Sequence, residues 1–170
     1  MRVFTETQKF NQSWMRVVLV SLALLTILPV MIMVDWNELP TAELIIVSIA
    51  IAFTLLMIGF ILFVFRLDSR IDDYGIHYGF FPIPGRMNKL AWSEIEKMYV
   101  RKYSPIGDYG GWGYRINFNK SKGKAYNVRG NIGIQLELKN GRKILIGTQK
   151  QGEAESAIRY YTNKDDHENY

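Results

Sequence analysis

Glycine and aromatic residues are concentrated in the segment SPIGDYGGWGYR, residues 104–115, which is the part of the chain best suited to hold a small ligand. Glycine lets a backbone adopt positive φ and approach a partner closely, and consecutive free N–H groups can form a nest for an anion. One arginine precedes the segment and another ends it. The sequence therefore predicts a phosphate or carboxylate site built from Arg101, Gly107, Asp108, Gly110, Gly111, Trp112 and Arg115.

A second interpretation of residues 104–115 is a long connection between strands, whose aromatic rings pack on a sheet or at a membrane interface. The segment does not end in Gly-Lys-Ser or Gly-Lys-Thr, so it is not a P-loop, and no βαβ pattern surrounds it as in a dinucleotide site. Both interpretations remain open, and the sequence favours the connection.

Residues for catalysis are sparse. The chain has no cysteine, and its two histidines, His77 and His167, are not spaced for a metal set or for a nucleophile–histidine pair. The adjacent Asp72 and Asp73 are better explained as the start of a strand than as an acid–base pair. We therefore expect no enzyme activity, no cofactor, no metal and no nucleic-acid partner.

Several basic and aromatic residues after position 66 could contact a membrane surface. A lysine close to anionic headgroups contributes about 1 kcal/mol to binding, although a lysine-rich turn is equally well explained as a solvated loop. Two phenylalanines follow the second apolar run closely, where they could enter the interface or pack inside the domain. The predicted surface contacts are Phe80, Phe81, Lys120, Lys122 and Lys124.

Two long uncharged runs must position these residues. Residues 17–34 form a run of 18 residues and residues 44–65 a run of 22 residues. At about 1.5 Å per residue each can cross a hydrocarbon core of about 30 Å as a helix. Because nine residues separate the runs, the sequence predicts a transmembrane hairpin over 17–66, preceded by a cytosolic segment over 1–16.

The charges around the hairpin predict its orientation. Lys9 and Arg16 precede it, Arg66 and Arg70 follow it, and the loop DWNELPTAE contains three acidic residues and no base. Basic residues near span ends stay in the cytosol, so both termini should be cytosolic. Neither run contains an ionisable residue, which makes transport by the hairpin alone improbable.

The remaining chain has the pattern of an antiparallel β domain, which we place at 67–162. In IGIQLELKNGRKILIGT, a loop of residues 139–141 with Gly141 left-handed pairs Ile144 with Leu136 and Ile146 with Ile134. A helix follows, capped by Thr148 and Gln151, and residues 163–170 should be a disordered tail. Strands are expected at 73–81, 89–92, 97–103, 114–119, 125–129, 133–139 and 143–147, and the apolar stripe of the helix at Ala154, Ala157, Ile158 and Tyr161.

Seven strands followed by one amphipathic helix, with WSEI at residues 92–95 and QLELKNG at residues 135–141, resemble a pleckstrin-homology-like domain. Over residues 15–161 the chain is similar to bacterial membrane proteins that carry two helices followed by such a domain. The resemblance implies a membrane-anchored α+β protein whose strands form a sandwich or partly open barrel closed by the last helix. It also implies a bacterial inner or plasma membrane.

These observations lead to three hypotheses about function. The first is a non-catalytic binding or scaffolding module that presents its domain to the cytosolic membrane surface, for a protein partner or for copies of itself. The second is a site for anionic lipid or a small anion at the glycine-rich segment. The third is an accessory subunit of a membrane enzyme or transporter. Membrane lipids are expected neighbours in all three.

Overall fold

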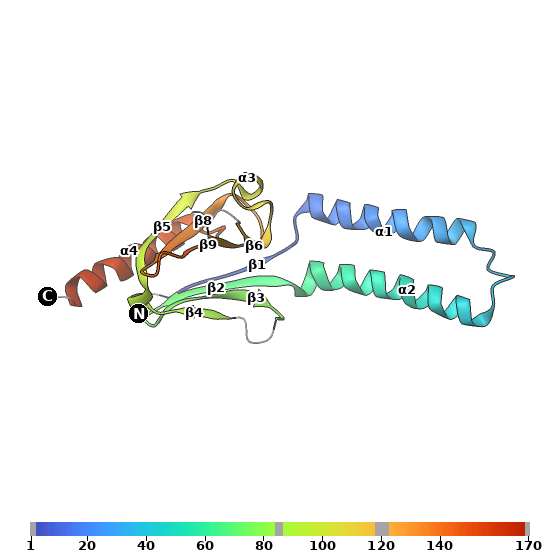
Figure 1. The fold of residues 1–170 in the computed structure, drawn as a ribbon, viewed down its shortest axis with the longest axis horizontal. Helices are drawn as coiled ribbons and strands as arrows, with labels where there is room; N and C mark the ends of the chain where they lie inside the picture. Colours follow the sequence, from blue (N-terminus) through green and yellow to red (C-terminus); the bar gives the residue numbers. More distant parts are fainter. Residues whose placement is uncertain (1–2, 84–86, 118–122, 169–170) are drawn as a thin grey trace. The chain divides into compact units, whose positions relative to one another are not determined.

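The computed structural model describes residues 3–83, 87–117 and 123–168 (Figure 1). The chain is α+β: two apolar helices lie near the N-terminus, and most of the rest forms strands before a final helix, as predicted. It divides into two compact units. The hairpin unit is Lys9–Phe65, and the β domain combines Met1–Gln8 with Arg66–Tyr170. The first residues of the predicted segment 1–16 therefore belong to the β domain.

Two helical spans make up the hairpin unit. Helix α1 is Ser13–Met33, and helix α2, Thr41–Gly59, continues as the π-helix η1, Phe60–Val64. The spans Ser13–Met33 and Thr41–Val64 have mean hydropathies of 2.4 and 2.9 and are long enough to cross a membrane. Their bounds extend the predicted ones at the N-terminal ends, because helical backbone includes the polar residues that flank each apolar run.

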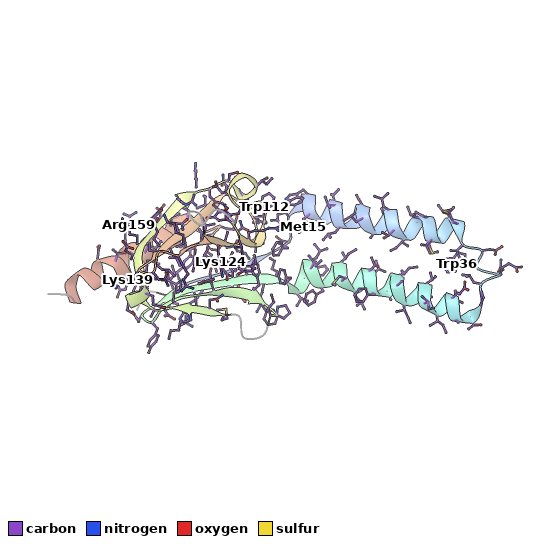
Figure 2. All side chains as sticks on the ribbon, in the orientation of Figure 1. Met15, Trp36, Trp112, Lys124, Lys139 and Arg159 are labelled. Carbon is purple, nitrogen blue, oxygen red and sulfur yellow. The ribbon has the colours of Figure 1, made fainter. Side chains whose placement is uncertain are left out.

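The hairpin has almost no buried interior. Of α1 and α2, only Ala23 is buried, and Leu25, Ile32 and Leu56 are 71%, 79% and 73% exposed. Figure 2 shows side chains projecting outward along the whole of both helices. The core helix of a water-soluble protein buries its apolar face, so these helices need an apolar environment that the chain itself does not supply.

Four strands form the first sheet of the β domain, in the order β1-β2-β3-β4 (Figure 1). Strands β2 and β3 are antiparallel and are joined by a two-residue turn at Asp73 and Tyr74. The predicted strand at 73–81 was therefore too long, and Asp72 and Asp73 do not begin it; the Asp72 Oδ1 accepts a hydrogen bond from the Tyr74 N–H at 2.9 Å and stabilises the turn. The bounds are β1 Phe4–Lys9, β2 Arg66–Asp72, β3 Gly75–Phe81 and β4 Asn88–Leu90.

Strand β1 connects the first sheet to the end of β9. Its buried positions are Phe4, Glu6 and Gln8, so two of its three inward side chains are polar. Glu6 accepts hydrogen bonds from the Thr148 hydroxyl at 2.6 Å and from the Gln149 N–H at 2.7 Å, and Gln8 donates to the carbonyl of Gly147 at 2.6 Å. The buried carboxylate is thus hydrogen-bonded, as burial of a charge requires.

Five strands form the second sheet, in the order β5-β8-β9-β7-β6. Its neighbours are antiparallel except β7 and β9, which are parallel. The described residues therefore contain nine strands, because β1 and β2 add to the seven predicted. The remaining bounds are η2 Trp92–Glu94, β5 Ile95–Lys102, α3 Pro105–Tyr109, β6 Gly113–Ile116, β7 Lys124–Asn127, β8 Ile132–Leu138 and β9 Lys143–Gly147.

The predicted register of the β8–β9 hairpin is confirmed. Ile134 lies opposite Ile146 and Leu136 lies opposite Ile144, and Gly141 adopts a φ of 77°. The same register keeps all four apolar side chains buried. Alternation along the two strands was sufficient to select it, because a shift by one residue would place the isoleucines of β9 opposite Glu137 and Gln135 instead of Leu136 and Ile134.

Helix α4, Gln151–Glu168, follows β9, and its predicted stripe of Ala154, Ala157, Ile158 and Tyr161 is buried. The predicted capping box is wrong, because the Thr148 hydroxyl donates to Glu6 and accepts from the Lys150 N–H instead. The helix also continues through residues 163–168 of the predicted disordered tail, where the sequence has no glycine or proline to end it.

The core of the β domain lies between the two sheets and α4. Trp92 stacks on Tyr161 with ring centroids 4.9 Å apart and donates through Nε1 to the carbonyl of Asp72 at 3.0 Å, which ties η2 to both the helix and the first sheet. The buried core residues are Phe4, Ile71, Ile76, Tyr78, Leu90, Ile134, Leu136, Leu138, Ile144, Ile146, Ala154, Ala157, Ile158 and Tyr161.

Burial predicts an alkaline limit to the stability of the domain. It raises the pKa of Tyr103 to about 12, and the hydroxyl accepts a hydrogen bond from Asn127 Nδ2 at 3.0 Å. An unfolded tyrosine loses its proton near pH 10. The folded state therefore holds more protons than the unfolded state between about pH 10 and pH 12, and stability should fall as the pH rises through that range.

We expect Tyr103→Phe to flatten this decline, at a cost of about 1 kcal/mol near neutral pH for the lost hydrogen bond. Urea unfolding of the detergent-solubilised protein at pH 8, 10 and 11 would measure the free energy of unfolding for both chains. Parallel pH curves for the wild type and the variant would contradict the expectation.

Candidate functional site: a basic pocket between the two sheets

The glycine-rich segment folds as a short helix with its own caps. Ser104 caps α3 by accepting a hydrogen bond at Oγ from the Gly107 N–H at 3.0 Å. Asp108 returns to the start of the helix and accepts from the Ser104 N–H at 3.0 Å. The helix ends at Tyr109 and is capped by Gly110, whose left-handed φ of 70° suits a glycine. Asp108 is therefore a capping residue.

The backbone N–H groups that an anion site would need are bonded within the protein. Gly110 N–H donates to the carbonyl of Ile106 at 2.8 Å, and Gly111 N–H donates to the carbonyl of Pro105 at 2.9 Å. Gly113 N–H donates to Asn127 Oδ1 at 2.8 Å. These three N–H groups are therefore not available to an anion. The geometry agrees with the second interpretation, a connection between strands β5 and β6.

The other predicted residues of this site brace the same connection. Arg101 Nε donates to Gln135 Oε1 at 3.0 Å, and its Nη1 lies 4.0 Å from Asp108 Oδ2. Arg115 Nε donates to the carbonyl of Trp112 at 3.0 Å, and Trp112 Nε1 donates to the carbonyl of Gly130 at 3.3 Å. The predicted residues do come together, but as a corner of the second sheet.

The predicted membrane-surface residues separate into three groups. Phe80 is 5% exposed and stacks on Tyr126, so it belongs to the domain interior. Phe81 is 45% exposed and lies under the Arg66 guanidinium, 4.4 Å from its ring centroid. Lys120 and Lys122 lie outside the described residues. Lys124 begins β7 and is exposed.

Lys124 also lines a pocket of ≈ 400 Å³ between the two sheets. The first sheet supplies strands β3 and β4, and the second supplies β6, β7, β9 and the β8–β9 turn. Figure 2 labels Lys124 within the β domain. The lining residues are Tyr78, Asn88, Ile116, Asn117, Gly123, Lys124, Tyr126, Asn140, Gly141, Arg142, Lys143 and Ile144.

Aromatic rings form one wall of the pocket. Tyr78 of β3 meets Tyr126 of β7 edge to face, with ring centroids 4.8 Å apart, and the ring centroid of Tyr114 of β6 lies 5.0 Å from that of Tyr126. Burial raises the pKa of Tyr78, and the nearby positive charge of Arg142 partly opposes the rise. The Tyr78 side chain is therefore a neutral, desolvated group beside a cation.

Basic side chains border the pocket. None of its described lining residues is an Asp or a Glu. Lys143 is neutralised by Glu137, with Nζ and Oε1 3.2 Å apart, and this contact lowers the pKa of Glu137. Arg142 is held by Asn140, whose Oδ1 accepts from the Arg142 Nε at 3.2 Å and from its backbone N–H at 3.1 Å. Arg142 and Lys124 have no partner for their terminal nitrogens within the described part of the chain.

A glycine fixes the rim where β7 begins. Gly123 has a φ of +72°, and a Cβ there would lie 2.0 Å from the carbonyl oxygen of Lys143. Only glycine lets the backbone pass this close to β9. The contact places Lys124 beside the β8–β9 turn, so the two unneutralised cations lie at the same pocket.

This pocket could not be predicted from the sequence alone, because its residues come from five separate segments of the chain. Among the predicted site residues that the structure describes, only Lys124 lines it. The KNGRK run at residues 139–143 is visible in the sequence as a basic turn. Its position beside Tyr78 and Tyr126 follows from the pairing of β7 with β9, and no short motif encodes that pairing.

One further titratable cluster surrounds Asp72. Its carboxylate lies 2.8 Å from Arg70 Nε and 3.5 Å from His77 Nε2, and its side chain is 4% exposed. The Asp72 oxygens are occupied by the turn and by Arg70, which gives the cluster a structural role. Within residues 3–83, 87–117 and 123–163, no group of three or more His, Asp or Glu side chains could hold a metal ion.

Comparison with known proteins finds no match. No protein-family model, no curated protein and no solved structure matches this chain.

Proposed function

We propose that this chain is an integral membrane protein whose hairpin anchors a non-catalytic binding domain at the cytosolic membrane surface. Two helices with exposed apolar side chains support the anchor. Two sheets and a terminal helix that share a buried apolar core support a pleckstrin-homology-like domain, although such a fold implies no particular ligand. The binding role comes from the pocket and from the exposed surface of the domain, which is suited to a protein partner or to another copy of the chain.

The observation that carries the proposal is that the hairpin is inserted between two neighbouring strands of one sheet. Strand β1 ends at Lys9, shortly before α1, and β2 begins at Arg66, directly after η1. The strands contact each other through the Thr7 hydroxyl, which donates to Asp68 at 2.6 Å. A domain made from both sides of a hairpin requires both ends of the hairpin on the same side of a bilayer.

The charges that flank the hairpin predict on which side of the membrane the domain lies. The bases Lys9, Arg16, Arg66 and Arg70 flank the open end, and the connecting loop contains only acidic charge. The domain would therefore face the cytosol, with the loop around Asn37 outside. The bacterial inner or plasma membrane remains the location suggested by the resemblance to two-helix bacterial proteins.

Cysteine labelling tests this topology directly, because the chain has no cysteine of its own. We expect Asn37→Cys to react with a membrane-impermeant maleimide in intact spheroplasts. Thr5→Cys in β1 and Asn163→Cys in α4 should react only after permeabilisation. All three positions are exposed in the structure. Labelling of Thr5→Cys and Asn163→Cys from opposite sides would contradict the inserted hairpin.

Crosslinking in native membranes tests the binding role separately. A specific partner, or a defined oligomer of the chain itself, is the expected product. Recovery of monomers alone would count against a scaffold.

A further inference from the structure

We propose that the pocket between Tyr78 and Arg142 binds a phosphate group attached to an apolar or ring-shaped body. The inference names a ligand for the proposed binding domain and rests on that proposed function. It differs from the site predicted at residues 104–115, whose N–H donors are already bonded. The phosphate would come from a lipid headgroup or from a soluble phosphate ester, which share this chemistry.

Two cations without carboxylate partners supply the anion-binding part. Asn140 engages only the Nε and the backbone N–H of Arg142, and this fixes the side chain while leaving both terminal nitrogens for a ligand. A guanidinium presenting its terminal N–H groups matches the paired oxygens of phosphate. Lys124 adds a second charge at the same pocket, which favours a phosphate dianion over a single carboxylate.

The aromatic and aliphatic wall supplies the rest of the recognition. Tyr78, Tyr126 and Ile144 line the pocket together with the cations, and Ile116 is 53% exposed at the pocket. A free inorganic anion would leave this surface unused. A ligand with a glycerol, sugar or other compact body would cover it.

The size of the pocket limits the body of the ligand. A volume of ≈ 400 Å³ lies at the lower end of the range of about 300 to 1,000 Å³ for small-molecule sites. It accommodates a headgroup or a small phosphate ester and leaves no room for two acyl chains. A bound lipid would therefore leave its chains outside the pocket.

Isothermal titration of the full-length protein in an uncharged detergent would test the inference. The probes are glycerol 3-phosphate and a short-chain phosphatidic acid below its micellar concentration, which both carry a phosphate monoester. We expect at least one to bind, and we expect Arg142→Gln and Lys124→Gln each to weaken that binding by about tenfold, the effect of one lost charge-assisted contact. Binding of only the first identifies a soluble ester, and binding of only the second identifies a lipid headgroup.

Lys139→Gln and Arg159→Gln are matched controls, because they remove exposed cations that do not line the pocket. Figure 2 labels both positions. The controls should bind like the wild type, and Arg142→Lys should recover only part of the affinity because a lysine cannot form the paired contact. Unchanged melting temperatures would show that the variants are folded.

Two results would overturn the inference: no binding of either probe by the folded wild type, or equal losses in the pocket variants and the controls. Neither result would affect cysteine labelling, which reports the anchor and its topology, or crosslinking, which reports a protein partner. Failure of the pocket is thus distinguishable from failure of the proposed function.

Discussion

A soluble chain that joins residues 1–9 to residues 66–170 through a short glycine-serine linker is expected to fold cooperatively, whereas residues 66–170 alone are not. Strands β1 and β2 are neighbours in the first sheet, so a linker of about four or five residues can replace the whole hairpin. The two chains differ in β1 alone. The comparison therefore measures what this strand contributes to the β domain.

The expected difference is large because β1 supplies both apolar and polar contacts. Removing it exposes the core around Phe4, which is 4% exposed, and loss of a buried phenylalanine costs about 3 to 5 kcal/mol. It also removes the Glu6 carboxylate from Thr148 and Gln149. The total approaches the usual stability of a domain, about 5 to 15 kcal/mol.

Circular dichroism and urea unfolding of the two soluble chains would measure this effect. A linked chain carrying Glu6→Ala is a useful intermediate, expected to fold with a free energy of unfolding lower by about 2 kcal/mol. Equal stability of the chains with and without β1 would show that the strand is dispensable and would refute this account of the domain.

The second large effect is expected from Gly75→Ala. Gly75 has a φ of +134°, and a Cβ there would lie 2.0 Å from the carbonyl oxygen of Leu90. Moving β3 away from β4 at this point would cost free energy, because Ile76 pairs with Leu90 in the β3–β4 ladder and both side chains are buried. The substitution should destabilise the domain by about 3 kcal/mol or more, from backbone strain together with the lost pairing.

Gly141→Ala is the matched control. Gly141 also has a positive φ, of +77°, but no atom lies within 4 Å of the position that its Cβ would occupy. Gly141→Ala should cost only about 1 to 2 kcal/mol, which is the usual cost of placing a non-glycine residue in the left-handed conformation. Thermal unfolding of the detergent-solubilised protein would compare the two. Similar shifts in melting temperature would mean that the close approach to Leu90 relaxes without cost.

The sequence was most informative where apolar residues are periodic. The uncharged runs identified both helices of the hairpin, alternation selected the pairing of Ile134 with Ile146, and helical spacing identified the stripe that contains Ile158. In each of these elements the side chains that face the interior are apolar. Their period alone therefore reveals the structure.

Strand β1 escaped prediction because its interior positions carry Glu6 and Gln8. An FTETQK segment has no apolar alternation, and the partners that make these side chains tolerable lie more than a hundred residues later, at Gly147 and Thr148. Strand β2 does alternate, with Leu67 and Ile71 buried. It was missed because Arg66 and Arg70 were interpreted only as charges flanking a membrane span.

Prediction of the candidate sites from the sequence is limited in the same way. Glycine density in residues 104–115 is compatible with a nest and with a tight connection, and only the acceptors decide between them. One of those acceptors, Asn127, lies on β7. The basic pocket depends likewise on the parallel pairing of β7 with β9, a long-range contact that short-range pattern does not specify.

If the hairpin spans a membrane as proposed, its position between β1 and β2 has a consequence for biosynthesis. The ribosome completes β1 first, then both apolar helices, and only then β2, so the first sheet has to wait for the hairpin. If only one helix entered the bilayer, β1 and β2 would be left on opposite sides and Glu6 could never reach Thr148. A folded domain would then exist only on chains whose hairpin had inserted completely, and chains that failed would remain open to proteolysis.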